Sequence, residues 1–267
     1  MRDHCFVIIF ILSAISIGSV LAQPAGSGTT VAAVRSADRS ERRLFQRFVE
    51  DAVISTGGWV ELQYRYENFD DGSRHVLGPL VAFKIANDLE GGLRFGWEDL
   101  NPDSAPNQSG LTDIDLFAKY RFGGRQGRGA VGALVKIATA DADEGLGTGS
   151  EDVELFAAWR ADLEAVSLTA NAGIRFNGDP DPPLPEADTS YLLGGAILLP
   201  ASPGLTFVIE TSYESQRIDG AEDDVRLTLG FQHHGRGGHG GYRGTVAVPL
   251  SDGAPDYQVI AGVYLTY

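Results

Sequence analysis

Apolar and polar residues alternate through most of this chain, from Trp59 to the final residue, Tyr267. The first stretch alternates Val60, Leu62, Tyr64 and Tyr66 with Glu61, Gln63, Arg65 and Glu67. Successive side chains of a β-strand point to opposite faces, so a period of two predicts strands with one apolar and one polar face. No long stretch after Gly57 has helical spacing. Crossover helices are therefore not expected, and the strands should pair antiparallel.

Alternation is also compatible with a soluble barrel or a sandwich, so the character of the two faces decides between them. The polar face mixes charged residues with glycine and alanine, which suits a crowded aqueous lumen. The apolar face carries aromatic residues near strand ends, such as Trp97 and Tyr242, as in the interfacial girdle of a membrane protein. We therefore predict an all-β fold, a transmembrane antiparallel up-and-down β-barrel of about twelve strands over residues 58–267.

The first 22 residues have the pattern of a secretory signal peptide. Arg2 precedes an apolar stretch from Phe6 to Ile17, and small residues precede Gln23. The apolar part falls short of the ~20 residues that span a bilayer, so a cleaved signal is favoured over an anchor. Cleavage would remove Cys5, the only cysteine, and no disulfide is expected.

Residues 23–57 are expected to form a separate periplasmic segment, because the spacing there differs from that of the barrel. Apolar pairs, for example Phe48 and Val49, recur one turn apart and predict a short N-terminal amphipathic helix from about Ser40 to Ile54. Two positions for this helix stay open. It could lie against the membrane interface or the barrel rim, or it could be inserted into the lumen as a plug.

Charged residues are distributed unevenly in a chain whose formal net charge is −15. This acidity argues against a nucleic-acid partner, since binding phosphates requires a basic surface. All three lysines and many arginines lie on the predicted lumen face. The expected lumen and selectivity residues are Arg65, Lys84, Arg94, Lys119, Arg121, Lys136, Arg175, Glu210, Arg226 and Arg243. They could form a filter that favours small organic anions, or a ladder of cross-strand ion pairs that stiffens the wall.

Long polar linkers alternate with short turns, which predicts long loops at one end of the barrel and short turns at the other. Linkers expected to be long include Asn68 to Val76 and Ala140 to Asp152. Carboxylates gather in these linkers, for example Asp141, Asp143 and Glu144. Solvated surface is the favoured interpretation, and bridging to lipopolysaccharide through divalent cations is the alternative.

Signals for catalysis are weak. His75, His233, His234 and His239 supply candidate bases for a lipase-type site, but no serine lies in a recognisable nucleophile motif. Three of these histidines lie in or beside the Gly-rich stretch from His233 to Gly241, where a turn explains them better than a metal site. The sequence predicts neither an enzyme nor a bound metal or cofactor.

Four stretches carry a resemblance to a known family. They are Leu111–Phe122, Val135–Ile137 followed by Gly145–Gly149, Ala170–Gly173 and Ser251–Tyr257. In these residues the chain resembles the outer-membrane transporter family associated with the meta-cleavage pathway of phenol degradation. Where that family is expected to have Pro-Thr-Gly-Asp, this chain has Ala138 to Asp141. The resemblance spans roughly residues 59–267 and implies a transport function.

Barrel size indicates a mechanism, because eight strands enclose only side chains and sixteen or more an open channel. About twelve strands predict a narrow bore and hence a channel or transporter for small organic solutes. The basic lumen residues favour anionic solutes, and the family resemblance implies aromatic ones. The alternatives are an integral outer-membrane enzyme of lipase type and a structural or adhesive barrel that acts through its acidic loops. The signal peptide and the terminal Tyr267 predict the outer membrane of a Gram-negative bacterium. Expected partners are outer-membrane lipids and lipopolysaccharide, the barrel assembly machinery through the C-terminal strand, and a small-molecule solute.

Overall fold

The computed structural model describes residues 42–267, apart from 125–126, 164, 181–184, 219 and 236–238. All of these residues belong to one unit, which extends from Asp38 to Tyr267. The predicted signal peptide (residues 1–22) and residues 23–41 lie outside the described part of the chain. Among the described residues there is no helix with the length and apolarity needed to cross a membrane.

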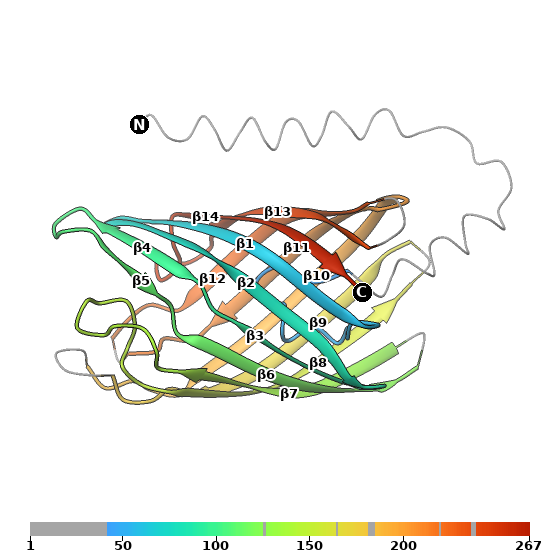
Figure 1. Ribbon diagram of the computed structural model, residues 1–267, viewed down its shortest axis with the longest axis horizontal. Coiled ribbons are helices and arrows are strands. Elements are labelled where there is room, and N and C mark those ends of the chain that lie inside the picture. Colours follow the sequence, from blue (N-terminus) through green and yellow to red (C-terminus); the bar gives the residue numbers. More distant parts are fainter. Residues whose placement is uncertain (1–41, 125–126, 164, 181–184, 219, 236–238) are drawn as a thin grey trace, which may run out of the picture. The chain divides into compact units, whose positions relative to one another are not determined.

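The described chain is built from antiparallel strands that hydrogen-bond side by side around a closed wall (Figure 1). The strands are β1 (Gly58–Phe69), β2 (Gly72–Ala86), β3 (Leu89–Arg94), β4 (Trp97–Pro102), β5 (Gln108–Leu111), β6 (Ile114–Gly123), β7 (Gly127–Ile137), β8 (Asp152–Asp162), β9 (Ser167–Phe176), β10 (Ser190–Ser202), β11 (Leu205–Glu214), β12 (Asp224–His234), β13 (Gly240–Pro249) and β14 (Tyr257–Thr266). Closure comes from β1, which pairs with both β2 and β14. Tyr64 of β1 lies opposite Leu77 on one side and Ala261 on the other.

Two of the barrel strands are interrupted. β3 pairs with the second half of β2 and β4 with the first half, with a break at Phe95 and Gly96. In the same way β6 pairs with β3 and β5 with β4, with a break at Thr112 and Asp113. With each interrupted pair counted as one strand, the described residues form a closed antiparallel barrel of twelve strands, which confirms the predicted fold class.

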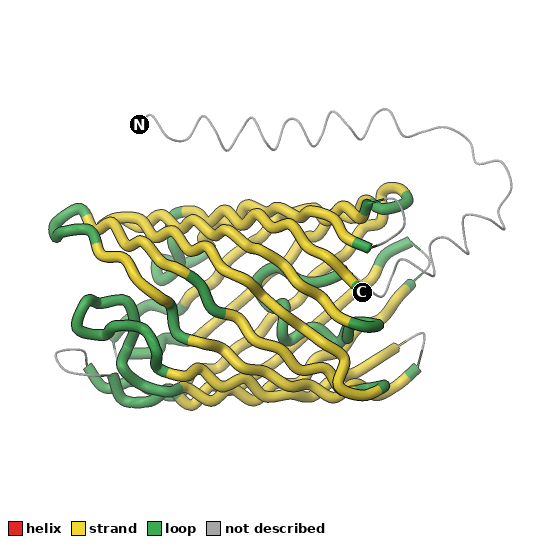
Figure 2. Tube along the Cα trace, viewed as in Figure 1, coloured by secondary structure: helices red, strands yellow, loops and turns green. Residues whose placement is uncertain are grey.

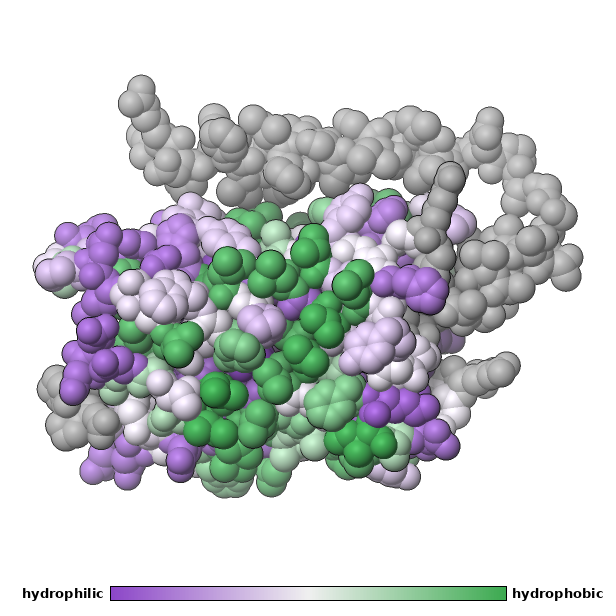
Figure 3. All heavy atoms as spheres, in the orientation of Figure 1, coloured by the Kyte–Doolittle hydropathy of each residue, from purple (hydrophilic) through white to green (hydrophobic). Residues whose placement is uncertain are grey.

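The alternation in the sequence corresponds to an inner and an outer face of the wall. Along β8, Glu154 and Arg160 point inward and are 1% and 0% exposed, whereas Leu155 and Trp159 point outward and are 48% and 50% exposed. An apolar band crosses the middle of the surface in Figure 3, and hydrophilic residues gather at the ends. Apolar side chains outside and charged side chains inside are the arrangement expected of a membrane barrel.

The two ends of the barrel differ in the length of their connections (Figure 2). The long-loop end carries the connections 138–151, 177–189 and 215–223, and the short-turn end carries turns such as 87–88 and 203–204. The prediction of a long linker from Asn68 to Val76 is wrong. Asp70 and Asp71 alone join β1 to β2, because the two strands stay paired as far as Phe69 and Gly72.

Residues 42–55, which we call the lumen segment, precede β1 and contain turns and bends. This corrects the prediction of an amphipathic helix from Ser40 to Ile54, of which only positions 40 and 41 lie outside the described residues. Every residue of the lumen segment except Gln46 is buried. The physical reason is that its backbone groups bond to inward-facing side chains of the barrel instead of to one another, as the contacts below show.

Candidate functional site

A buried cluster of charges ties the lumen segment to the barrel wall. Arg43 donates from Nη1 and Nη2 to the two carboxylate oxygens of Glu90 on β3, at 3.0 and 2.7 Å. Lys119 on β6 lies 3.2 Å from the same carboxylate, and all three side chains are fully buried. At the other end of the segment, the backbone N–H of Ser55 donates to Glu90 at 2.5 Å. One carboxylate therefore pairs with two cations and holds both ends of the segment.

A second carboxylate takes the place of helical hydrogen bonds. Glu210 on β11 accepts the backbone N–H groups of Phe45, Gln46 and Arg47, at 2.8, 3.1 and 3.0 Å. In an α-helix these N–H groups would donate to carbonyl oxygens four residues earlier. Here a turn presents three successive donors to one fully buried carboxylate, an anion-binding arrangement of backbone N–H groups. The helix is absent because the barrel supplies the acceptor.

The carbonyl oxygens of the lumen segment are also bonded by cations of the wall. Arg160 donates to the carbonyl of Arg42 at 2.9 Å, and Arg243 donates to that of Leu44 at 2.5 Å. Lys119 donates to the carbonyls of Val49 and Asp51, at 3.1 and 2.8 Å. Buried backbone groups need such partners, so these cations fix the path of the irregular segment.

Apolar contacts also hold the lumen segment near the short-turn end. The ring of Phe48 lies 5.8 Å from that of Trp59, which stacks on Tyr264 at 4.0 Å. The guanidinium of Arg43 lies 4.8 Å above the Phe48 ring. Phe48 and Val49 share this buried cluster with Leu80, Ala82, Phe117 and Phe156 of the wall. The segment therefore occupies this half of the lumen with a packed apolar core of its own.

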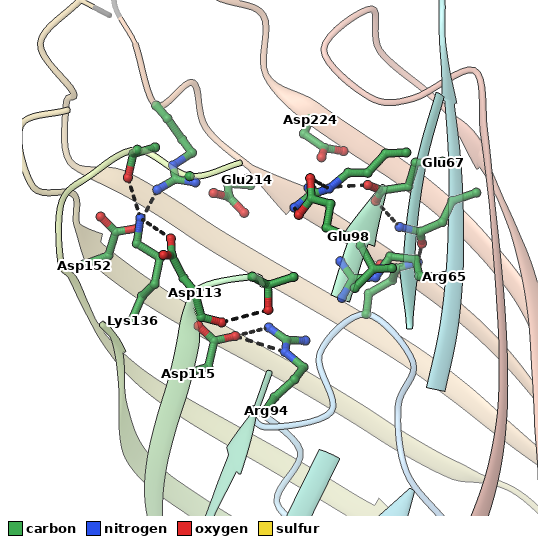
Figure 4. Close-up of a pocket in the computed structure, with 18 of the residues that line it drawn as sticks. Arg65, Glu67, Arg94, Glu98, Asp113, Asp115, Lys136, Asp152, Glu214 and Asp224 are labelled. Atoms are coloured by element: carbon green, nitrogen blue, oxygen red, sulfur yellow. Dashed lines mark hydrogen bonds and ion pairs between the residues drawn. The ribbon is translucent and has the colours of Figure 1, made fainter. Parts of the chain in front are cut away.

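A cavity of about 800 Å³ lies on the side of the lumen segment that faces the long loops (Figure 4). Gln46 and Arg47 of the segment line it, as do Ile218 and Glu222 of a long loop. Eight basic and eight acidic side chains line the cavity: Arg47, Arg65, Arg74, Arg94, Lys136, Arg175, Arg217, Arg226, Glu67, Glu98, Asp113, Asp115, Asp152, Glu214, Glu222 and Asp224. Its size is that of a small-molecule site, and its charges balance.

Most of these charges are paired across strands. Arg94 lies 2.5 Å from Asp115, and Lys136 lies 3.1 Å from Asp152. Arg175 on β9 bridges Glu154 on β8 at 2.7 Å and Glu214 on β11 at 2.5 Å. Such pairs compensate charges that face a confined interior. They match the ladder of cross-strand ion pairs that was one interpretation of the sequence.

The ten predicted lumen residues fall into three groups. Five line the cavity: Arg65, Arg94, Lys136, Arg175 and Arg226. Three contact the lumen segment: Lys119, Glu210 and Arg243. The remaining two lie near the short-turn end, where Arg121 pairs with Asp88 at 2.8 Å and Lys84 is exposed. Eight of the ten predicted residues therefore lie at the cavity or against the lumen segment, and two lie at neither.

Several anchoring residues were not in the predicted set. Glu90 lies next to a turn, where nothing in the local sequence distinguishes it from a solvated carboxylate. Arg160 pairs with Asp51 of the lumen segment at 3.2 Å, a contact between positions more than a hundred residues apart. The only signal in the sequence was the alternation along β8, which places the side chain of Arg160 on the inner face of the barrel.

The histidines near the Gly-rich turn do not converge. His233 stacks on the ring of Tyr242 at 4.9 Å, whereas His234 is buried and lies 2.8 Å from the hydroxyl of Tyr264. Adjacent residues of a strand point to opposite faces, so these two imidazoles are separated by the wall. Within the described part of the chain, no group of three or more His, Cys, Asp or Glu side chains is arranged to hold a metal ion.

Comparisons with known proteins support the fold. No protein-family model and no curated protein matches the chain. An outer membrane channel from Pseudomonas putida F1 has a similar structure, with a TM-score of 0.65 and 15% identity over 82% of this chain and 98% of that chain. The KdgM porin is similar with a TM-score of 0.52 and 15% identity, over 78% of this chain and 99% of its own. The same porin in complex with disordered oligogalacturonate aligns with a TM-score of 0.50. The chain has the fold of outer-membrane β-barrel proteins.

Proposed function

We propose that this protein is an outer-membrane channel for small organic solutes, in particular anionic and aromatic ones. The observation that carries the proposal is the charged cavity of about 800 Å³, enclosed by a barrel whose outer face is apolar. An apolar outer face is stable against lipid, and a charged interior is stable against water. A protein built in this way has a polar compartment at membrane depth, which is what a solute path requires.

The lumen segment is the gate or constriction of this path. It packs against side chains of β1, β2, β6, β8 and β14 in the half of the lumen near the short-turn end. The cavity lies on its other side, toward the long loops. A solute that enters from the long loops would meet Gln46 and Arg47 before it could pass further. We expect wild-type conductance to be small for this reason.

The basic side chains of the cavity can contact anions, but acidic side chains balance their charge, so the solute class rests mainly on two resemblances. The KdgM porin complex holds oligogalacturonate, a sugar chain that carries carboxylates, in a barrel of similar fold. The sequence resemblance to the phenol-degradation transporter family favours aromatic compounds. Small aromatic acids satisfy both, so they are the solutes to test first.

We also propose how the protein is placed in the cell. In outer-membrane barrels the longer loops face the exterior, so the long-loop end would be extracellular and the lumen segment periplasmic. The acidic loops would contact lipopolysaccharide, and the strand that ends in Tyr267 would be read by the assembly machinery. Fractionation of cells and heat-modifiable migration on gels test this placement.

Single-channel recording tests the channel directly. Purified protein in planar bilayers is compared with a variant that lacks residues 40–54, with Glu151→Gln in an exposed loop as a control. The wild type is expected to show small conductance steps, the deletion larger ones, and the control unchanged ones. Absence of conductance in both the wild type and the deletion would contradict the channel, and equal conductance would contradict the obstructing role of the lumen segment. Hydrolysis of the bilayer lipid would instead favour the lipase-type alternative.

A further inference from the structure

We infer that Arg65 forms a carboxylate-binding subsite in the cavity, with the apolar part of its ligand against Val76 of β2. The inference rests on the proposed function and gives it a substrate class. The ligand is a small monocarboxylate with one apolar group.

Arg65 differs from the other arginines of the cavity wall in its lack of a partner. Within the described residues its side chain forms no hydrogen bond or ion pair, and its Nε is buried without an acceptor. Arg74, by contrast, lies 2.8 Å from Glu98, and Arg94 lies 2.5 Å from Asp115. A guanidinium that lines a cavity with its donors unused can bind a carboxylate through two parallel hydrogen bonds.

The side chain of Arg65 is unpaired because the carboxylate of Glu67 binds other residues. Oε2 of Glu67 lies 3.6 Å from Arg74, and Oε1 lies 3.5 Å from Arg226. Oε1 also accepts a hydrogen bond from Gln258 at 2.5 Å. Arg65 interacts electrostatically with Glu67 and with three further arginines, Arg74, Arg94 and Arg226. Both oxygens of Glu67 are therefore engaged by other residues, which leaves the Arg65 guanidinium without a carboxylate at ion-pair distance.

An apolar strip lies directly beside Arg65. In the register of β1 and β2, Arg65 is opposite Val76, so the two inward side chains are cross-strand neighbours. The next inward positions along β2 are Gly78 and Leu80, and all three positions line the cavity. Gly78 has no side chain, and its backbone packs closely on that of Phe95 and Gly96. The backbone of Phe95 and Gly96 fills the space next to Gly78, and Leu80 is only 1% exposed, so Val76 supplies the apolar surface beside the guanidinium.

The carboxylates around the subsite limit the ligand to one negative charge. Glu98, Asp115 and Glu67 all line the same cavity. Each of these carboxylates is already paired with an arginine, so a second carboxylate on the ligand would find no further unpaired cation among the described residues of the cavity. A neutral analogue would leave Arg65 unpaired and gain only the apolar contact. A monocarboxylate with an apolar group uses both features.

Calorimetric binding to the purified full-length protein in detergent tests the subsite without reference to conduction. The probes are benzoate, its neutral analogue benzyl alcohol, and the dianion phthalate, at neutral pH. Wild-type protein is expected to bind benzoate at least tenfold more tightly than either comparator. Arg65→Gln is expected to weaken benzoate at least tenfold and leave benzyl alcohol unchanged, and Arg65→Lys to fall between. Arg121→Gln, outside the cavity, is the control, and heat-modifiable migration verifies that each variant folds.

The outcomes separate this inference from the proposed channel. Equal benzoate affinity of the wild type and Arg65→Gln would overturn the subsite, and so would equal affinity for benzoate and benzyl alcohol. If Arg65-dependent binding occurs in a protein that does not conduct in bilayers, the subsite stands and the channel proposal fails. If the protein conducts but binds benzoate independently of Arg65, the channel proposal stands and the subsite fails.

Discussion

Arg43 of the lumen segment and Glu90 of β3 form a fully buried ion pair with two hydrogen bonds, at 3.0 and 2.7 Å. The pair connects residues on either side of β1 and β2, so it depends on the segment lying inside the finished barrel. It thus links the conformation of the lumen segment to closure of the wall.

Glu90→Gln is expected to release the lumen segment. The change leaves the cations of Arg43 and Lys119 buried without their carboxylate, and breaking such a pair costs about 3–5 kcal/mol. The measurement is the rate of trypsin cleavage after Arg43 in the folded barrel, which should rise at least tenfold, together with the frequency of large conductance steps. Asp88→Asn, at the nearby turn, should change neither. A cleavage rate equal to that of the wild type would show that Glu90 does not hold the segment.

Glu210→Ala is expected to have a similar effect through the backbone. It removes the acceptor of three buried N–H groups, each worth about 1–3 kcal/mol when left unpaired. Hydrogen exchange of the Phe45 and Arg47 amides should accelerate by at least tenfold, while amides of β14 should exchange as in the wild type. Retained protection at Phe45 would mean that another group serves as the acceptor.

Closure by the lumen segment is expected to weaken as the pH rises. Burial raises the pKa of Glu50 to about 7, against the opposing charge of Arg47, and nearby Glu154 raises it further. A carboxyl whose pKa is raised in the docked state favours docking at low pH, and this advantage is lost as the pH rises through about 7. Channels should therefore open more often at pH 8 than at pH 5.5, by about one order of magnitude. Glu50→Gln should abolish the difference, and a pH dependence that survives this change would assign it to another group.

Leu229→Arg is expected to destabilise the barrel in lipid. Leu229 lies at the middle of β12, points outward and is 41% exposed. An arginine at the bilayer midplane costs about 2–4 kcal/mol, whereas the same residue in a loop costs little. Urea unfolding in vesicles should show a loss of this size for Leu229→Arg and no change for Glu151→Arg. Equal stability of the two variants would place Leu229 away from the acyl chains.

The wall of the barrel was predictable because residues of the inner and outer faces alternate in the sequence of each strand. Glu154 and Arg160 alternate with Leu155 and Trp159 in the sequence as they do in space. The period of two is a local property, so it can be read without knowledge of the strand's neighbours. The same alternation predicted that the side chains of Arg65 and Lys136 point into the barrel.

The lumen segment was not predictable in the same way. Its apolar spacing favours a helix, but its conformation is set by Glu210, Glu90 and Arg160, which lie far away in the sequence. Tertiary hydrogen bonds override a local pattern when they satisfy the backbone groups that a helix would pair. The breaks at Gly96 and Asp113 were missed for a related reason, since they depend on how neighbouring strands are paired.

The orientation of the two faces is tested most directly by fluorescence quenching in lipid. Cys5 is the only cysteine of the chain, so single-cysteine variants are made in a Cys5→Ser background. Ile209→Cys lies on the outer face of β11, and Ser212→Cys lines the cavity on the same strand. Each is labelled with bimane and reconstituted in brominated phospholipid. We predict strong quenching at position 209 and little at 212; equal quenching, or stronger quenching at 212, would contradict a barrel with lipid outside and water inside.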